Sequence, residues 1–302
     1  MKVAVYCITK NEEQFIERWA ISASDADYLV VVDTGSTDGT VEAALTAGCR
    51  VHIINVNPWR FDDARNASLA LIPADVDMCI ALDADEVLLP GWREALEKTP
   101  PNITRPRYLY TWSWNPDGTP GLTYFGDKIH SRHGYHWTHP VHEVITRYAD
   151  TPEVQGHCGV EIHHFPDNTK SRSSYLPLLE MSVREDPNDD RNCHYLGREY
   201  FYMGQWDKAI PELKRHLRIG NWAPEKAKSM RLLAKMIPEE EEQWLLTAAE
   251  IDGGRREVWF DLARRAHRLE DWTKCLQYST RCLEITERDN LYLNEPEPWG
   301  PI

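Results

Sequence analysis

The chain has 302 residues, 42% of them hydrophobic and 27% charged, which is an ordinary composition for a soluble globular protein. Its net charge of −14 argues against nucleic-acid binding, which needs a basic surface, and against adsorption to anionic membranes. No stretch approaches the roughly 20 consecutive apolar residues that would span a bilayer.

The beginning of the sequence and its cysteines indicate a cytoplasmic protein. Met1–Tyr6 resembles a first strand rather than a signal peptide, because a long apolar region and a cleavage site are missing. The seven cysteines are scattered, and no two form a Cys-x-x-Cys pair. Several lie in apolar patterns, where a thiol behaves as a small buried hydrophobic group. A reducing compartment is therefore expected.

Up to about residue 100, short apolar runs alternate with amphipathic stretches, as is typical of a parallel α/β sheet. Residues 101–167 instead carry proline, glycine, aromatics and many histidines, which predicts antiparallel strands and loops over the open edge of that sheet. The predicted strands are Val3–Ile8, Tyr28–Val32, Val51–Val56 and Met78–Leu82. The predicted helices lie around Glu12–Ser24, Val41–Ala47 and Asp62–Leu71.

From about Lys170 onward the pattern is helical and it repeats. Small and aromatic residues recur with the spacing of a tetratricopeptide unit, in which small residues lie where two helices cross. Trp206 and Trp272 are separated by about two repeat lengths. Between them, Ala223–Met236 and Glu239–Ile251 predict a degenerate middle pair of helices. An ordinary helical bundle is the alternative interpretation.

An apolar run that ends in acidic residues is the strongest chemical signal in the sequence. The predicted strand Met78–Leu82 leads directly into Asp83, Ala84, Asp85 and Glu86. Ligands gather at the carboxyl ends of parallel strands, and three carboxylates this close repel each other unless a positive group lies among them. Mg²⁺ or Mn²⁺ bridging a diphosphate would supply that charge. A solvated acidic loop is the alternative.

Polar residues also follow the first two predicted strands. Thr9 and Asn11 come after the first strand, and Asp33 ends the second one before a turn rich in glycine and hydroxyl groups. Asp33 could accept a hydrogen bond from a base or a ribose. Both segments also have a structural interpretation, since Thr9, Asn11 or the hydroxyls of Ser36–Thr40 could simply cap the helices that follow.

Taken together, these segments resemble the family 2 glycosyltransferases. The family's order and approximate spacing are kept across residues 1–90, and the resemblance weakens across 100–167. Val141–Glu143 and Ile162–Phe165 are similar to motifs of one subgroup, in which a GT-A catalytic domain precedes tetratricopeptide-like helices. The four segments that carry the resemblance are Lys10–Glu13, Asp33–Thr40, Ala64–Ala67 and Asp83–Glu86.

The resemblance implies a divalent metal, Mn²⁺ or Mg²⁺, and a nucleotide-sugar donor, with UDP-sugars favoured over GDP- and dTDP-sugars. It assigns direct metal coordination to Asp85 and places Asp83 near the ribose or a metal-bound water. The third ligand in the family is often a histidine, for which His164 is expected and His163 competes. Neighbouring residues on a strand point to opposite faces, so one of these two rings can meet the metal while the other packs. The residues expected around the nucleotide are Thr9, Asn11, Glu12, Asp33, Arg65, Asp83 and Ala84.

Two of these assignments leave alternatives open. Arg65 follows a short loop, so it could reach phosphate or pair with Asp33, or it could form a surface salt bridge to Asp62 or Asp63. An inverting transfer also needs a general base near the acceptor. Glu143 lies where inverting relatives place their catalytic acidic residue, and Asp127 is the alternative.

The acceptor could be held by the aromatic-rich segments Tyr108–Trp114 and Tyr135–Trp137, because aromatic rings stack on sugars and on peptide side chains. Alternating aromatics in a strand more often mark a half-buried sheet. The helical repeats offer a concave surface for an extended partner, so a protein or peptide acceptor is expected, with a glycan as the rival. Homodimerisation would be a third use of these helices.

These observations predict a GT-A-type α/β nucleotide-binding domain with a mixed sheet over residues 1–167, followed by an all-α tetratricopeptide-like domain over 168–302. The leading functional prediction is a metal-dependent, inverting glycosyltransferase. A non-catalytic helical-repeat protein with a relic nucleotide-binding domain is the alternative. A nucleotidyltransferase ranks last, because Thr9–Glu13 contains no glycine-rich phosphate loop.

Overall fold

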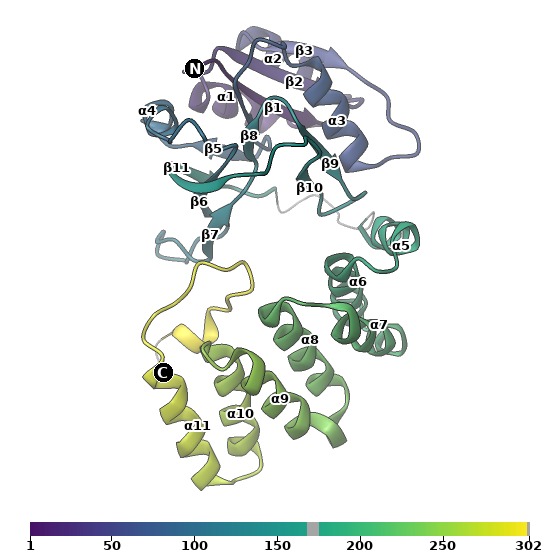
Figure 1. Cartoon of the computed structure of the whole chain (residues 1–302), viewed down its shortest axis with the longest axis vertical. Helices are drawn as coiled ribbons and strands as arrows, with labels where there is room; N and C mark the ends of the chain where they lie inside the picture. Colours follow the sequence, from purple (N-terminus) through teal and green to yellow (C-terminus); the bar gives the residue numbers. More distant parts are fainter. Residues whose placement is uncertain (168–174, 301–302) are drawn as a thin grey trace. The chain divides into compact units, whose positions relative to one another are not determined.

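The computed structural model describes residues 1–167 and 175–300, and the chain divides into two compact units (Figure 1). The units are Met1–Ser171 and Arg172–Ile302. The sequence places this boundary between residues 167 and 168, and the observed division falls in a stretch outside the described residues. Among the described residues, no helix combines the length and the apolar character needed to cross a bilayer.

A five-stranded sheet with the order β3-β2-β1-β4-β8 forms the centre of the first unit. The first four strands in that order are parallel, and β8 is antiparallel to β4. The strands are β1 (Val3–Thr9), β2 (Tyr28–Asp33), β3 (Arg50–Ile53), β4 (Met78–Ala81) and β8 (Ile129–Ser131). The helices between the parallel strands are α1 (Glu13–Ser22), α2 (Thr40–Thr46) and α3 (Phe61–Leu71).

The three inner strands β2, β1 and β4 are largely buried on both faces of this sheet, which explains why they are apolar almost without interruption. On one face, Val3 and Val5 of β1 share a hydrophobic core with Trp19 of α1. On the other face, Tyr6 of β1 belongs to a second core with Leu69 of α3. Alternate residues of one strand therefore fix helices on opposite faces, and this leaves the strand ends free to carry polar groups.

A second, four-stranded sheet has the order β5-β11-β6-β7. The predicted antiparallel pairing is correct for β7 with β6 and for β5 with β11, but β6 and β11 are parallel. A parallel partner requires a long crossover, and the chain between β6 and β11 supplies it. The additional elements are β5 (Glu86–Leu88), α4 (Trp92–Glu97), β6 (Arg105–Thr111), β7 (Thr123–Gly126), β9 (Tyr135–Thr138), β10 (Val144–Arg147) and β11 (Gln155–His164).

The predicted fold class is confirmed: an α/β unit with a mixed sheet precedes a helical unit. The main difference lies in the third strand, which ends at Ile53 rather than at Val56. The helices of the second unit are α5 (Tyr175–Glu185), α6 (Asp190–Tyr202), α7 (Trp206–Ile219), α8 (Ala223–Met236), α9 (Glu241–Asp252), α10 (Arg256–Arg268) and α11 (Trp272–Glu284). Two short 3₁₀ helices, η1 (Pro238–Glu240) and η2 (Glu297–Trp299), complete it.

Successive helices of the second unit pack in pairs, as a tetratricopeptide-like domain requires, with α6 against α7, α8 against α9 and α10 against α11. Gly197 lies at a helix crossing, because a Cβ atom there would come within 2.6 Å of Leu213 on the facing helix. Trp206 and Trp272 occupy equivalent positions as the first residues of α7 and α11. Both side chains are exposed, so they do not pack in the core between the helices.

A buried polar network links β1 and β8 of the five-stranded sheet to β9. The Tyr6 hydroxyl lies 3.1 Å from Nε2 of His130, and the Trp137 indole N–H donates to the same hydroxyl at 2.9 Å. His130 Nδ1 lies 2.8 Å from the carbonyl oxygen of Ser131. Burial lowers the pKa of His130 to about 4, so the ring is neutral near pH 7.

We expect protonation of His130 to weaken the first unit in acid. A histidine whose folded pKa lies below its unfolded value contributes stability above the unfolded pKa and loses it as the pH falls through the folded one. At about 1.4 kcal/mol per pKa unit, the loss is about 3 kcal/mol between pH 6.5 and pH 4. Urea unfolding near pH 7 and near pH 4.5 should therefore show the gap between the unaltered chain and His130→Gln shrinking in acid. Parallel pH dependence of the two proteins would contradict this expectation.

Candidate active site

The carboxyl ends of the parallel strands bring the predicted residues to one edge of the first sheet. Thr9 pairs in register with Asp33, and the backbone N–H of Leu82, just past β4, donates to the Tyr6 carbonyl at 3.0 Å. Asp83 and Asp85 follow immediately. The linear motifs of the sequence thus converge because their strands are neighbours in one parallel sheet.

Asp33 and Asn11 brace the two loops that follow β1 and β2. The Asp33 carboxylate accepts the backbone N–H groups of Gly35 and Ser36, each at 2.9 Å. Asn11 has a left-handed backbone, with φ of 56°, and its side-chain oxygen accepts the Thr37 N–H at 2.8 Å. Both residues therefore stabilise these loops, but Asn11 does not cap a helix as the sequence allowed, because neither α1 nor α2 has a side-chain cap at its first turn. Their contact with a nucleotide stays a prediction.

The remaining predicted nucleotide residues line the same edge. Thr9 donates from its hydroxyl to Asp33 at 3.2 Å, and the backbone N–H of Glu12 donates to the Thr40 hydroxyl at 2.8 Å. Ala84 is buried between the two aspartates of the acidic segment. These residues therefore lie at the carboxyl ends of β1 and β4, where a nucleotide would bind in the predicted site.

Lys128 neutralises two of the three clustered carboxylates. Its ammonium group donates to Asp83 Oδ2 at 2.8 Å and to both oxygens of Glu86 at 2.8 and 3.0 Å. The Tyr110 hydroxyl also donates to Glu86, at 2.6 Å. The chain's own cations therefore supply much of the positive charge that the sequence assigned to a metal.

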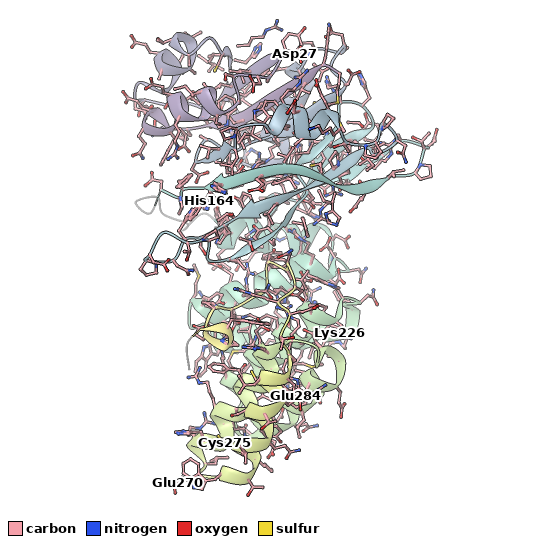
Figure 2. The ribbon with its side chains drawn as sticks, turned by 90° about the vertical axis from the view of Figure 1, so that its left-hand side faces the viewer. Asp27, His164, Lys226, Glu270, Cys275 and Glu284 are labelled. Carbon is pink, nitrogen blue, oxygen red and sulfur yellow. The ribbon has the colours of Figure 1, made fainter. Side chains whose placement is uncertain are left out.

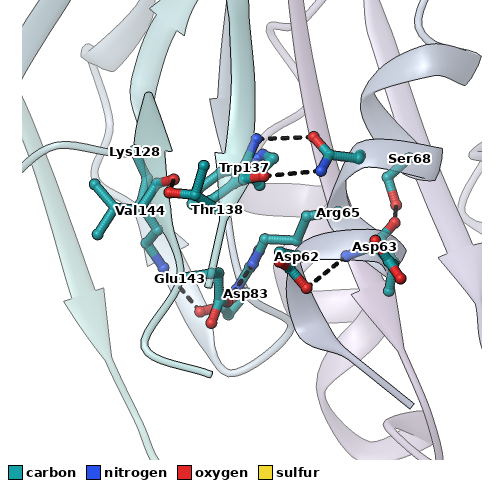
Figure 3. Close-up of polar contacts among 12 residues, drawn as sticks. Asp62, Asp63, Arg65, Ser68, Asp83, Lys128, Trp137, Thr138, Glu143 and Val144 are labelled. Atoms are coloured by element: carbon teal, nitrogen blue, oxygen red, sulfur yellow. Dashed lines mark hydrogen bonds and ion pairs between the residues drawn. The ribbon is translucent and has the colours of Figure 1, made fainter. Parts of the chain in front are cut away.

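Arg65 connects this acidic segment to the loop between β9 and β10 (Figure 3). Its Nη2 donates to Asp83 Oδ1 at 2.7 Å, and its Nε pairs with the Glu143 carboxylate. Its guanidinium carbon also lies 4.9 Å from the centre of the Trp137 ring. The suggested surface bridge to Asp62 or Asp63 is wrong, because Arg65 is buried and pairs with other carboxylates.

Burial and charge act in opposite directions on these groups. Burial raises the pKa of Asp83, but Arg65 and Lys128 outweigh it and hold that pKa well below its ordinary value. Burial raises the pKa of Glu86, and Asp83 adds to the effect. Burial lowers the pKa of Lys128, but the two carboxylates raise it above its ordinary value. Asp83 and Lys128 are therefore charged at neutral pH.

Asp85 and His164 face each other beside this cluster. Antiparallel pairing of β11 with β5 aligns His164 with Glu86, and His164 Nε2 then lies 3.3 Å from Asp85 Oδ2. Nδ1 of the ring lies 2.9 Å from the Trp112 carbonyl, and the ring stacks on the Trp112 indole at 4.3 Å between centroids. Figure 2 locates His164 at the end of its strand. The ring is thus oriented with Nε2 toward the carboxylate.

His163 points away from this pair. Its ring lies edge-on to Trp114, with centroids 4.7 Å apart, and burial lowers its pKa. The two histidine rings thus lie on opposite faces of the strand, as alternation predicts. Of the two predicted metal-binding candidates, His164 is the one that the structure brings to Asp85.

The donor set of Asp85 and His164 fits a divalent cation that shares its coordination shell with a ligand. A carboxylate oxygen suits Mn²⁺ or Mg²⁺, and an imidazole whose other nitrogen bonds a backbone carbonyl is the usual arrangement of a metal-binding histidine. Within residues 1–167 and 175–300, no group of three or more His, Cys, Asp or Glu side chains could hold a metal by itself. The remaining ligands would have to be substrate oxygens and water.

The two candidate general bases are held in different places. Glu143 lies in the β9–β10 loop, pairs with Arg65 and keeps a side chain that is 12% exposed. Asp127 pairs instead with Arg105, at 2.7 Å. Glu143 therefore belongs to the cluster at the strand ends, whereas the Asp127 carboxylate is held by an arginine of β6.

The aromatic-rich segments serve mainly as core. Tyr108 and Tyr110 of β6 and Trp137 of β9 are all buried. Trp112 instead stacks on His164 and so belongs to the site. Sequence reasoning missed Lys128 and Tyr110 as members of the cluster. A usable signal for Lys128 was available, since three adjacent carboxylates call for a buried cation.

Comparison with known proteins relates the N-terminal part of the first unit to a family. Residues 4–102 match the model of glycosyl transferase family 2. This segment is a family 2 glycosyl transferase domain. The family 2 domain includes the strand ends that carry Thr9, Asp33 and the acidic segment Asp83–Glu86, and the helical unit lies outside the match.

Related sequences carry glycosyltransferase names. An uncharacterized glycosyltransferase of Rickettsia typhi is 35% identical over 109 residues, which are 36% of this chain and 36% of that protein. The lipopolysaccharide core biosynthesis glycosyltransferase LpsC of Rhizobium meliloti is 29% identical over 128 residues, covering 39% of this chain and 47% of LpsC. The chain thus spans between about a third and a half of the length of these relatives.

Among solved structures, glucosyl-3-phosphoglycerate synthase from Mycobacterium tuberculosis, in complex with Mn²⁺, UDP-glucose and phosphoglyceric acid, is 28% identical. The likeness covers 37% of this chain and 45% of that one, with a TM-score of 0.32.

Proposed function

We propose that this protein is a metal-dependent, inverting glycosyltransferase that moves a sugar from a nucleotide-diphosphate sugar, a UDP-sugar in the favoured case, to a protein, peptide or glycan acceptor. The family 2 match over residues 4–102 and the glycosyltransferase names of the relatives support the reaction class. The observation that carries the proposal is the pairing of Asp85 with His164 Nε2 at the carboxyl edge of the sheet.

Asp85 and His164 are the residues that would hold Mn²⁺ or Mg²⁺. When bound, the ion would neutralise the negative charge that develops on the leaving diphosphate. The Trp112 carbonyl and indole orient the His164 ring, so less conformational entropy is lost when the site binds its ligand. Lys128 already binds the carboxylates of Asp83 and Glu86. Of the three acidic residues, Asp85 is therefore the one whose carboxylate would coordinate the ion.

Glu143 is the proposed general base, which accepts the proton of the acceptor hydroxyl. Its pairing with Arg65 holds the carboxylate beside the acidic cluster at the strand ends, where an acceptor hydroxyl would have to approach.

Replacing Glu143 by Gln should therefore lower the turnover number for transfer by about 100-fold or more while nucleotide affinity changes little. Asp127→Asn is the matched control, because it removes the alternative carboxylate, and its turnover should stay near that of the unaltered chain. Rapid-quench transfer assays together with nucleotide titrations would measure both quantities. Loss of transfer in Asp127→Asn alone would reassign the base.

The proposed activity can be tested without knowing the acceptor. Purified protein is incubated with UDP-, GDP- and dTDP-sugars in the presence of Mn²⁺, and release of the nucleoside diphosphate is followed by chromatography. Slow, metal-dependent hydrolysis of one donor is expected, because water can replace the missing acceptor. Failure of every donor, together with failure to bind any nucleotide, would favour the non-catalytic alternative.

A further inference from the structure

A segment that follows α11 lies across the helical unit like a bound peptide. We define the groove segment as residues 289–299, which contain no helix or strand apart from η2 (Glu297–Trp299). Its side chains contact α6, α8 and the start of α10, which are the first helices of the three packed pairs. The contacts are made residue by residue over the stretch Tyr-Leu-Asn-Glu.

Tyr292 is seated between the first two pairs. Its ring stacks on Tyr195 of α6, with centroids 6.3 Å apart and planes 15° from parallel. Trp222, which precedes α8, lies 6.0 Å away on the centroid measure. The phenolic hydroxyl donates to the Glu225 carboxylate of α8. The groove thus offers an aromatic slot with a hydrogen-bond acceptor at its base.

Glu295 is held by two cations of α8. Arg231 donates to both carboxylate oxygens, at 2.8 and 3.1 Å, and Lys228 pairs with the same group. Burial raises the pKa of Glu295, but Arg231 and Lys228 outweigh it and bring it to about 2. The backbone N–H of Glu295 also donates to Glu257 of α10, at 3.1 Å.

Leu293 and Asn294, which lie between Tyr292 and Glu295, also contact the helices. Arg255, at the start of α10, donates to the side-chain oxygen of Asn294 at 2.7 Å. Leu293 is buried and lines a small pocket together with Ala227 and Val258. Each of the four side chains from Tyr292 to Glu295 therefore makes its own contact with the helices or with a residue that adjoins them.

This arrangement differs from that of a structural cap. A terminal cap covers the apolar face of the last repeat, whereas the groove segment reaches all three pairs. It also covers the charged side chains of Lys228 and Arg231. Arg231 donates from Nε to Asp261 at 2.6 Å, so the groups left to bind an anion if the segment departed are the Lys228 ammonium and the two terminal nitrogens of Arg231. The segment is held mainly by side-chain contacts to the helices rather than by a backbone ladder, which suits reversible docking.

We propose that this groove is a peptide-binding site, occupied here by the chain's own segment, and that its other occupant is an extended segment of a partner protein. The partner segment would carry an aromatic residue followed three positions later by a carboxylate, because the Tyr195–Glu225 slot and the Lys228–Arg231 pair are set at that spacing. The groove segment competes with the partner for the same groove, so a partner must bind tightly enough to displace it. This inference stands independently of the transferase proposal.

The test uses a fluorescent peptide with the sequence of residues 288–299, titrated into the full chain and followed by anisotropy. In the double variant Tyr292→Ala/Glu295→Gln the built-in segment is weakened, and the peptide should bind at least about tenfold more tightly than to the unaltered chain. Adding Lys228→Met to this variant should remove that gain. Lys226→Met is the matched control, since it lies on the same helix (Figure 2) and should leave binding unchanged.

Peptides in which the tyrosine is replaced by alanine, or the first glutamate by glutamine, should lose most of the affinity. Failure of the unmodified peptide to bind the double variant, with circular dichroism unchanged, would overturn the proposal and make the segment a fixed part of the fold. Equal binding to the unaltered chain would overturn it as well, because the peptide would then bind elsewhere. A dimer of the unaltered chain that the double substitution dissociates would assign the groove to a second copy and overturn the partner peptide.

Discussion

Replacing Asp85 by Asn is expected to lower metal-dependent cleavage of the nucleotide sugar by at least about 100-fold. The amide keeps the size of the side chain but removes the negative charge that would hold a divalent cation. Stability should change little, because the Asp85 side chain is partly exposed and faces His164 rather than a buried cation. Steady-state release of nucleoside diphosphate, measured across Mn²⁺ concentrations, checks this prediction.

Asp117→Asn is the control for this experiment. Asp117 is an exposed aspartate of the same unit whose carboxylate accepts a bond from Thr119 in its own turn, so its substitution should leave cleavage unchanged. A Mn²⁺ response in Asp85→Asn equal to that of the unaltered chain would remove Asp85 from the proposed metal site.

Replacing Arg65 by Met is expected to destabilise the first unit by about 3–5 kcal/mol, the cost of breaking a buried ion pair by removing one partner. The substitution leaves the carboxylates of Asp83 and Glu143 without the guanidinium that joins them. For a unit of this size, each kcal/mol corresponds to about 2–4 °C in the melting temperature. Differential scanning calorimetry would measure the shift of the first-unit transition.

The effect of Arg65→Met should depend on pH in a defined direction. The pKa of Asp83 is depressed in the folded chain, so its ionised form contributes stability above the ordinary value and loses it in acid. The gap between the variant and the unaltered chain should therefore be largest near neutral pH and narrow as Asp83 becomes protonated. Arg93→Met is the matched control: Arg93 also pairs with two carboxylates, but on the surface, and its loss should cost about 1 kcal/mol or less.

The parallel sheet was predictable because its inner strands β1, β2 and β4 are largely buried on both faces. Each of these strands then appears as an apolar run, and the order of strands and helices follows from the sequence pattern. The acidic segment was predictable for the same reason, since Asp83 and Asp85 directly follow such a run. The helical unit was predictable from its small residues, of which Gly197 at a crossing is the clearest example.

The partners within the site were not predictable in the same way. Lys128 and Glu143 reach Asp83 and Arg65 through pairings between residues far apart in the sequence. The register that aligns His164 with Glu86 likewise depends on β11, whose parallel pairing with β6 has no local signal. The docking of the groove segment was not predictable either, because the contacts that order Tyr292 and Glu295 come from three different helices.

The central claim, that the strand ends form a metal-assisted nucleotide-sugar site, is tested most directly by calorimetric titration of UDP, GDP and dTDP into the full chain. The proposal predicts that one of these nucleotides, UDP in the favoured case, binds in the presence of Mn²⁺. That binding should be lost both in EDTA and in Asp85→Asn. Binding that is indifferent to metal and to Asp85, or the absence of binding by all three nucleotides, would contradict it.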